Sequence, residues 1–293
     1  MTGTKKILKA SWRVLREEGL LTLAEYSLKK ISRGEFRILE PKTPRELQLH
    51  NPKIREEIRS RNEKILQDGA PDKFPIPPVN LVELVTGSID LEWFLQSGSL
   101  NTVNLENLLR KNALNLSDFE AILDFGCGCG RVIRHLKTNG KLYGCDYNSE
   151  AIDWAKENLK FAEFSVNQLE PPTTYSNGEF DLIIAISVLT HMTEQICHKW
   201  MGEFRRLLRP HGFLVLSLHG QGSLQDLTNE ERRRFLAGQI VVREERHVGS
   251  NRCATFHPNK YVIEELVKGF RVVDFVPKGL HNFQDLYLLQ NLK

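Results

Sequence analysis

The feature that most constrains the fold of this chain is a glycine-rich turn that follows a short apolar run. The run covers residues 121–125, and Gly126, Gly128 and Gly130 follow it. An apolar run of this length is typical of a buried strand, and glycines let the backbone turn tightly and come close to a ligand. We expect residues 131–138 to form a helix whose free N–H groups point to the same place. The pattern predicts a ligand site at the end of a buried strand.

A carboxylate ends the next apolar run. Asp146 lies twenty residues after Gly126 and directly follows residues 141–145. An acid at the end of the second strand can accept hydrogen bonds from both hydroxyls of a ribose. The turn and the acid together predict a site for a nucleoside-containing cofactor.

The glycine spacing separates the candidate cofactors. A dinucleotide site has the pattern G-x-G-x-x-G, and its third glycine would fall at Arg131 or Ile133 here. The sequence has G-x-G-x-G instead, with Asp124 two residues before the first glycine. This arrangement resembles motif I of the class I S-adenosylmethionine-dependent methyltransferases, and it disfavours a nicotinamide-dependent reductase.

The resemblance covers about residues 119–293 and implies S-adenosylmethionine as the cofactor. In that family the loop passes the methionine end, so Asp124 would steady the loop and the methionine amino group, and Asp146 would hold the ribose. The amide oxygen of Asn167 would accept a hydrogen bond from the adenine amino group, with a surface turn as the alternative. The cofactor contacts expected in this way are Asp124, Gly126, Cys127, Gly128, Gly130, Arg131, Asp146, Tyr147, Asn167, Gln168, Ile186 and Ser187.

Two of these residues have plain alternatives. Tyr147 follows the ribose acid and either covers the adenine or is an ordinary, partly buried tyrosine. Arg131 either reaches the carboxylate of the cofactor or is a solvated arginine.

The alternation of apolar runs and helical patterns predicts an α/β protein with a parallel sheet that is covered on both faces. The resemblance implies a Rossmann-like sheet of seven strands whose last strand is antiparallel. Strands are expected at 121–125, 141–145, 162–166, 181–186, 213–218, 271–276 and 284–290, and helices at 105–112, 131–138, 149–159, 194–208 and 260–268. The predicted domains are a basic amphipathic helix in 1–40, a helical and extended segment in 41–118 that contributes to a lid, and the cofactor-binding domain in 119–293 with a cap inserted at 220–257.

Composition indicates a soluble globular protein. The chain has 293 residues, of which 41% are hydrophobic and 26% charged, and no apolar run has the length of a membrane span. Its five cysteines include three near the glycine loop, which does not suggest a disulfide framework. Cys127 and Cys129 lack the neighbouring ligands of a zinc site, so no metal is expected. We expect a cytoplasmic protein, in which residues 5–31 pack on the main domain or a second copy, or contact an anionic membrane or a partner.

The charge is unevenly distributed. Residues 1–34 hold eight basic and three acidic side chains, a balance of +5, so the remainder of this +3 chain carries −2. No basic stripe is interleaved with aromatic residues. The distribution predicts that no nucleic acid is a partner.

The end of the fourth strand bears on the acceptor. Enzymes that methylate exocyclic amines of bases carry Asn/Asp-Pro-Pro-Tyr/Phe/Trp here, whereas this chain has Ile-Ser-Val-Leu at 186–189. A hydroxyl acceptor gains from a general base, and histidine suits that role near pH 7. His191 and His219 follow the fourth and fifth strands and are the predicted bases, with a structural role as the alternative. Trp93, Phe94 and His257 are the predicted acceptor contacts.

These patterns predict an S-adenosylmethionine-dependent methyltransferase that acts on a small-molecule or glycan-type acceptor, at oxygen rather than nitrogen. One alternative is a protein or lipid methyltransferase recruited by the N-terminal helix. Another is a non-catalytic scaffold subunit that keeps the fold.

Overall fold

The computed structural model describes residues 51–293 of the chain, so the helix expected over residues 5–31 lies outside the described residues. The chain divides into two compact units, residues 1–60 and 61–293. Of the first unit, the structure describes only the start of α4 (Pro52–Asp68). The site described below lies within the second unit.

The centre of the second unit is a seven-stranded sheet with the strand order β3-β2-β1-β4-β5-β9-β8. Strands β1 to β5 pair in parallel, and β9 runs antiparallel to both β5 and β8. This confirms the predicted Rossmann-like α/β fold. The strands are β1 (Ala121–Phe125), β2 (Lys141–Asp146), β3 (Glu163–Val166), β4 (Phe180–Ala185), β5 (Leu208–Leu218), β8 (Phe270–Leu280) and β9 (Gln284–Asn291).

The chain order around β1 determines where a ligand can bind. The strand order reverses at β1, which pairs with β2 on one side and with β4 on the other. In open α/β sheets, ligands bind beyond the carboxyl ends of the strands at such a reversal. Gly126, Asp146 and Ser187 all lie at or just after the carboxyl ends of these three strands.

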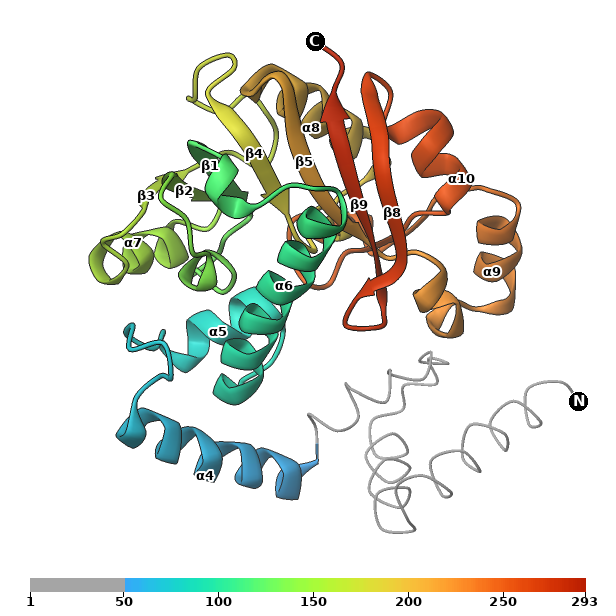
Figure 1. The fold of residues 1–293 in the computed structure, drawn as a ribbon. Coiled ribbons are helices and arrows are strands. Elements are labelled where there is room, and N and C mark those ends of the chain that lie inside the picture. Colours follow the sequence, from blue (N-terminus) through green and yellow to red (C-terminus); the bar gives the residue numbers. More distant parts are fainter. Residues whose placement is uncertain (1–50) are drawn as a thin grey trace, which may run out of the picture. The chain divides into compact units, whose positions relative to one another are not determined.

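Helices cover both faces of the sheet (Figure 1). On one face lie α8 (Glu194–Leu207) and α10 (Asn259–Tyr261). On the other lie α6 (Leu91–Lys111) and α7 (Ser149–Asn158). Because both faces are covered, β1 is buried at all five positions, which explains its continuous apolar sequence.

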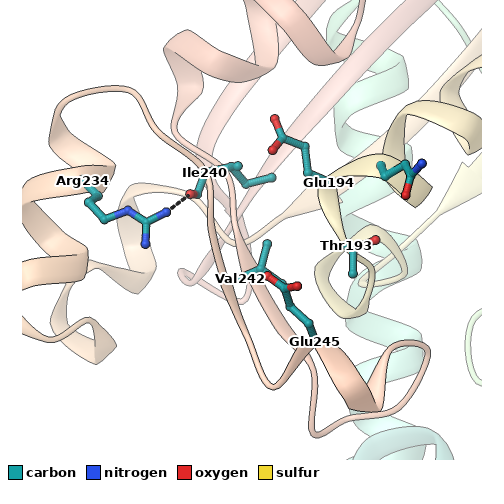
Figure 2. Close-up of a pocket in the computed structure, with 7 residues that line it drawn as sticks. Thr193, Glu194, Arg234, Ile240, Val242 and Glu245 are labelled. Carbon is teal, nitrogen blue, oxygen red and sulfur yellow. Dashed lines mark hydrogen bonds between the residues drawn. The ribbon is translucent and has the colours of Figure 1, made fainter.

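The cap, residues 220–257, follows β5 and has a small core of its own, formed by Leu227, Phe235, Val241 and Phe256. Its elements are η4 (Gln221–Asp226), α9 (Asn229–Leu236), β6 (Val241–Arg243), η5 (Glu245–His247) and β7 (Ala254–Phe256), with β6 and β7 paired antiparallel. A cavity of 560 Å³ lies between the cap and the start of α8, with Arg234 on one side and Glu194 and Glu245 facing it (Figure 2). None of its lining residues belongs to the glycine loop, so this cavity is not the predicted cofactor site.

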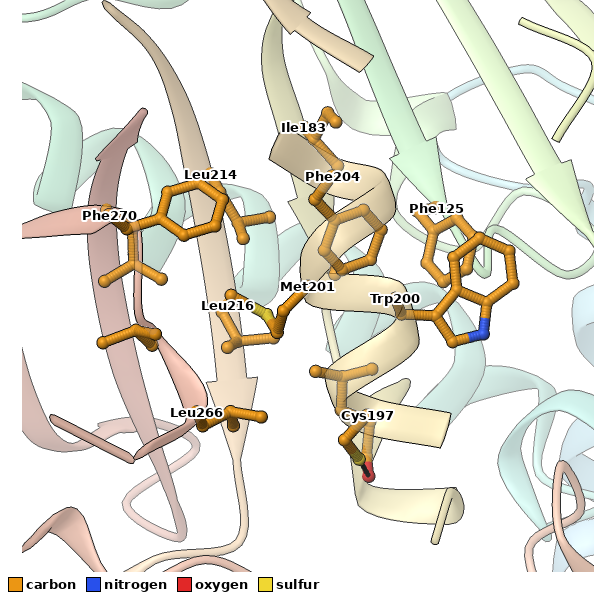
Figure 3. Packing of buried hydrophobic residues seen from close by; sticks show 14 of the residues in the cluster. Phe125, Ile183, Cys197, Trp200, Met201, Phe204, Leu214, Leu216, Leu266 and Phe270 are labelled. Carbon is orange, nitrogen blue, oxygen red and sulfur yellow. Dashed lines mark hydrogen bonds between the residues drawn. The ribbon is translucent and has the colours of Figure 1, made fainter. Parts of the chain in front are cut away.

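An aromatic cluster supports the end of β1 from the α8 face (Figure 3). The ring of Phe125 lies with its centroid 4.4 Å from that of Trp200 and 4.9 Å from that of Phe204. All three side chains are essentially buried, and burial of each contributes about 1.5–3 kcal/mol or more. The glycine loop therefore starts from a rigid point.

Three helices differ from the sequence prediction. The helix expected at 131–138 is only the short 3₁₀ turn η2 (Ile133–His135). The buried guanidinium of Arg134 donates to Asp72 and to the carbonyl of Phe74, which holds the turn in place. Conversely, α6 begins at Leu91 rather than at residue 105, because Asp90 caps it by accepting from the N–H of Trp93 at 3.1 Å.

A further helix that the sequence did not predict, α5 (Val79–Thr86), lies shortly before α6 in the chain. The helix expected at 260–268 divides into α10 and a π-helical turn, η6 (Val262–Leu266). In residues 51–293, no helix is both long enough and apolar enough to cross a membrane.

Candidate active site

The glycine loop requires glycine for both conformation and space. Gly126, Gly128 and Gly130 have φ of 74°, 52° and 82°, in the left-handed region. A Cβ on Gly126 would lie 2.4 Å from Val188, and one on Gly128 would lie 2.6 Å from Val85 of α5. The loop therefore comes close to the residue after Ser187 and to α5, and a side chain at either glycine would disrupt it.

The loop and the acid at the end of β2 are in direct contact. Asp146 accepts a hydrogen bond from the N–H of Gly128 through Oδ2 and from the N–H of Asn148 through Oδ1, both at 2.9 Å. Burial raises the pKa of the carboxyl group. Each oxygen keeps a further lone pair, so the carboxylate can still accept from ribose hydroxyls.

Asp124 lies beneath the loop. It is 2% exposed and accepts from the N–H of Ile133 at 3.1 Å. Burial raises its pKa to about 7, against the opposing charge of Arg131. The hydrogen bond from Ile133 to Asp124 joins the residues just before and just after the glycine loop.

The other loop side chains point away from the space above the sheet edge. The Arg131 guanidinium lies 3.4 Å from the hydroxyl of Ser97 on α6. Cys127 is 3% exposed, and burial raises the pKa of its thiol, which is therefore neutral at pH 7. All five cysteines are free and buried.

On the β3 side, Asn167 provides an unsatisfied acceptor. Its N–H donates to the carbonyl of Asp146 at 3.0 Å, and its side-chain Nδ2 donates to the carbonyl of Gln168 at 2.6 Å. Its Oδ1 is buried and has no hydrogen-bond partner in the described part of the chain. An unsatisfied acceptor in this position suits the exocyclic amino group of adenine.

A segment of the cap lies against this same edge; we refer to residues 247–253 as the strap. The hydroxyl of Tyr147 donates to the carbonyl of Gly249 at 2.7 Å. Asn251 Nδ2 donates to the carbonyl of Leu84 in α5 at 2.8 Å. The strap thus joins the end of β2 to α5, next to the glycine loop.

His191 is held by the strap. Its carbonyl accepts from the N–H of Gly249 at 2.7 Å, and its ring Nδ1 donates to the carbonyl of Cys253 at 2.8 Å. Burial lowers the pKa of the imidazole. The ring is therefore neutral at pH 7.

The structure brings His219 to within 6.3 Å of His191, measured between ring centroids. The His219 ring lies 5.3 Å from that of Phe256 and 5.4 Å from that of Phe283. Burial and the neighbouring histidines lower its pKa to about 3. A group with such a low pKa is a weak proton acceptor at neutral pH.

Two of the predicted acceptor contacts lie in the core. Phe94 is fully buried, and so is His257, whose Nε2 lies 3.9 Å from Cys197 Sγ. Trp93 is 36% exposed, and its ring packs on that of His281. The apolar residues around Trp93 and Phe94 could be recognised in the sequence, but the sequence could not show which side of α6 would face the core.

The sequence did not single out a polar network at the carboxyl ends of β4 and β5. Ser187 has φ of 60°, and its N–H donates to the hydroxyl of Ser217 at 2.8 Å. The hydroxyls of Ser187 and Ser217 both donate to Oε1 of Gln284, at 2.9 and 2.7 Å. Ile186, just before Ser187, is only 6% exposed. The one sequence signal was a glutamine that precedes the apolar run of β9.

Metal ligands are not grouped in the structure. Across residues 51–293, no cluster of three His, Cys, Asp or Glu side chains could hold a metal ion.

Comparison with known proteins finds methyltransferases that are similar to this chain. Residues 122–212 match the model of the methyltransferase domain. The chain is 30% identical to the tRNA N(3)-cytidine methyltransferase METTL2 of Danio rerio over 134 residues, which cover 42% of this chain and 38% of that protein. It is 25% identical to the tRNA N(3)-methylcytidine methyltransferase trm140 of Schizosaccharomyces pombe over 166 residues, covering 53% and 52%.

A different kind of relative is the EEF1A lysine methyltransferase 2 of Danio rerio, which is 30% identical over 118 residues, 36% of this chain and 50% of that protein. The chain thus spans about two fifths to one half of the length of these relatives. Among solved structures, an S-adenosylmethionine-dependent methyltransferase from Leishmania major shares the fold, with a TM-score of 0.51 and 16% identity over 72% of this chain and 80% of that one.

Proposed function

We propose that this chain, whose residues 122–212 belong to the class I S-adenosylmethionine-dependent methyltransferases, methylates a ring nitrogen of a base in RNA, with N3 of cytidine as the first candidate. Relatives from several vertebrates and from a yeast, similar over 132–166 residues, are named for that reaction on tRNA.

The names of these relatives correct two predictions from the sequence. The small-molecule or glycan-type oxygen acceptor is wrong, and so is the expectation that no nucleic acid is a partner. The missing Asn-Pro-Pro-Tyr pattern argued against exocyclic amines, but a ring nitrogen is not an exocyclic amine. The net charge of a whole domain also does not show which segment of the chain neutralises phosphates.

The similarity to enzymes that are named for N3 of cytidine carries the nitrogen acceptor, and the histidines at the sheet edge are consistent with it. Burial lowers the pKa of His191, and that of His219 to about 3. A hydroxyl acceptor would need a group that takes its proton near pH 7. A ring nitrogen such as N3 of cytosine presents an in-plane lone pair and loses no proton when it is methylated.

S-adenosylmethionine supplies an electrophilic methyl group on a sulfonium when it is bound. Asp146 would accept from the ribose hydroxyls and Asn167 Oδ1 from the adenine amino group, while the methionine end would pass the glycine loop. In the reaction the N–CH₃ bond forms as the S–CH₃ bond breaks, and the positive charge passes from sulfur to the base. The protein contributes alignment of donor and acceptor.

The lysine methyltransferase relative suggests protein as a second acceptor class. A lysine ammonium must lose a proton before it can attack, and His219, whose pKa burial lowers to about 3, is a weak acceptor for that proton. This favours RNA over protein as the acceptor.

Labelled-methyl transfer tests the class of acceptor. The purified chain is incubated with methyl-labelled S-adenosylmethionine and a cell extract, and the products are then treated with ribonuclease or with protease. We expect the macromolecular label to be sensitive to ribonuclease. Label that only protease releases would overturn the proposal.

A further inference from the structure

The start of β9 places a glutamine at the edge where the acceptor would lie. Gln284 is the first residue of β9, and the antiparallel register pairs Leu218 with Asp285. His219, the next residue after β5, therefore lies opposite Gln284. Directly opposite residues in an antiparallel pair point to the same face of the sheet.

The Gln284 side chain is held on one side only. It is 8% exposed, and its Oε1 accepts hydrogen bonds from the hydroxyls of Ser187 and Ser217. Its Nε2, with two N–H donors, makes no hydrogen bond with any residue that the structure describes. Nε2 is not one of the buried polar atoms that lack a partner, so solvent reaches it and its two donors are open to a ligand.

The same network extends to the cofactor loop. Ser187 adopts a left-handed φ of 60° that is uncommon for serine, so its surroundings hold it in place. The next residue, Val188, lies against Gly126 of the loop. Only Ser187 and Val188 thus separate the Gln284 amide from the loop. The ring of Phe283, the residue before Gln284, lies beside that of His219.

We propose that Gln284 binds the acceptor base, donating a hydrogen bond from Nε2 to the ring carbonyl of cytosine, and that Ser187 and Ser217 position its amide. This inference rests on the proposed function. In cytosine the carbonyl at position 2 is adjacent to N3, so a donor fixed on that carbonyl turns the N3 lone pair toward a defined place. The aromatic rings of His219 and Phe283 offer a surface on which a planar base can stack.

The test uses a synthetic stem-loop RNA with a single loop cytidine, and a second RNA in which 2-thiocytidine replaces it. Sulfur is a poorer hydrogen-bond acceptor than oxygen, so the wild-type protein should methylate the thio RNA with a lower kcat/KM. Gln284→Leu should lower kcat/KM for the cytidine RNA about tenfold, the scale of one lost hydrogen bond. In that variant the thio replacement should have no further effect, because the two changes remove the same contact.

Three further variants separate this role from a general effect on folding. Gln284→Glu keeps the size of the side chain and the bonds from the two serines but removes the donor, so it should lose at least as much activity as Gln284→Leu. Ser217→Ala should lose less. Gln290→Leu changes a half-buried glutamine near the far end of β9, which bonds to Arg271 and to the carbonyl of His211 away from the site, and should keep wild-type kcat/KM. All four should bind S-adenosylhomocysteine within twofold of wild type.

The outcomes separate this inference from the proposed function. A wild-type protein that methylates the RNA, with Gln284→Leu and Gln284→Glu within twofold of it, would overturn the role of Gln284 and leave the proposed function standing. An equal thio effect in wild type and Gln284→Leu would do the same. A wild-type protein that methylates no RNA would overturn the proposed function, and this inference with it.

Discussion

At the scale of single residues, a few short contacts define the cofactor site. Asp146 accepts from the N–H of Gly128 and keeps lone pairs for the hydroxyls of a ribose. Asn167, just after β3, has an unsatisfied acceptor, and two strands separate β3 from β4. The glycine spacing and the position of the acid could be read from the sequence, because both follow buried strands closely. The Ser187–Gln284 contact could not, because it joins residues 97 positions apart.

Replacing Asp146 with Ala should weaken S-adenosylhomocysteine binding roughly ten- to a hundredfold, since hydrogen bonds to a charged group contribute about 1.5–3 kcal/mol. Isothermal titration measures the affinity. Asp153→Ala, an exposed acid on α7, is the matched control and should bind as wild type does. An unchanged Kd in Asp146→Ala would remove this carboxylate from the site.

The buried state of His219 should make stability depend on pH. Its pKa in the folded chain is about 3, below the value of 6.5 for a free imidazole. Between these values the unfolded chain binds a proton that the folded chain does not, so the stability is present above pH 6.5 and is lost as the pH falls. The slope from one such group is at most about 1.4 kcal/mol per pH unit.

Urea unfolding at pH 7.5 and 5.5 checks this. The wild-type protein should lose more free energy of unfolding between the two conditions than His219→Gln does. Equal losses in the two proteins would mean that His219 is protonated in the folded state.

At the scale of elements, the strands were predictable and the connections were not. Each core strand is an apolar run that can be recognised locally, and the structure confirms the sheet that they form. The helix expected at 131–138 failed because distant residues decide that segment: Arg134 is drawn to Asp72, 62 positions earlier. The start of α6 was readable in principle, since Asp90 is a favourable N-cap residue.

The contact between the strap and α5 supports the proposal that residues 71–100 and the cap, residues 220–257, form a lid over the acceptor, next to the cofactor loop. Hydrogen exchange in residues 79–86 and 247–253 should slow when S-adenosylhomocysteine binds. Tyr147→Phe removes the bond to Gly249 and should speed exchange in the strap. Tyr143→Phe is the control, because Tyr143 is a partly buried tyrosine of β2 that packs on Phe180, away from the strap. Protection confined to residues 126–130 would contradict the lid.

At the scale of the whole molecule, the charges are divided between two parts. The basic surplus of +5 lies in residues 1–34, whereas the remainder carries −2. We propose that the basic segment provides phosphate contacts for RNA. Each phosphate contact contributes to the salt dependence of binding, by a slope of about −0.7 to −0.9 in log K against log salt.

Replacing both Lys5 and Lys6 with Gln should therefore weaken RNA binding and reduce the slope of log K against log salt by up to about two units. Fluorescence anisotropy with a labelled tRNA transcript, at several salt concentrations, measures both quantities. The control pair Lys137→Gln and Lys141→Gln removes the same charge from exposed positions of the folded domain, at and before the start of β2. Equal slopes in the two variants would contradict a special role for the N-terminal segment.

The identity of the methylated nucleoside tests the central claim most directly. A tRNA transcript is incubated with the full chain and S-adenosylmethionine, digested to nucleosides and resolved by liquid chromatography with mass spectrometry against authentic standards. We predict 3-methylcytidine, because N3 of cytosine presents an in-plane lone pair and loses no proton when it is methylated. A product of 2′-O-methylated nucleosides, or of 5-methylcytidine, with no 3-methylcytidine would contradict it.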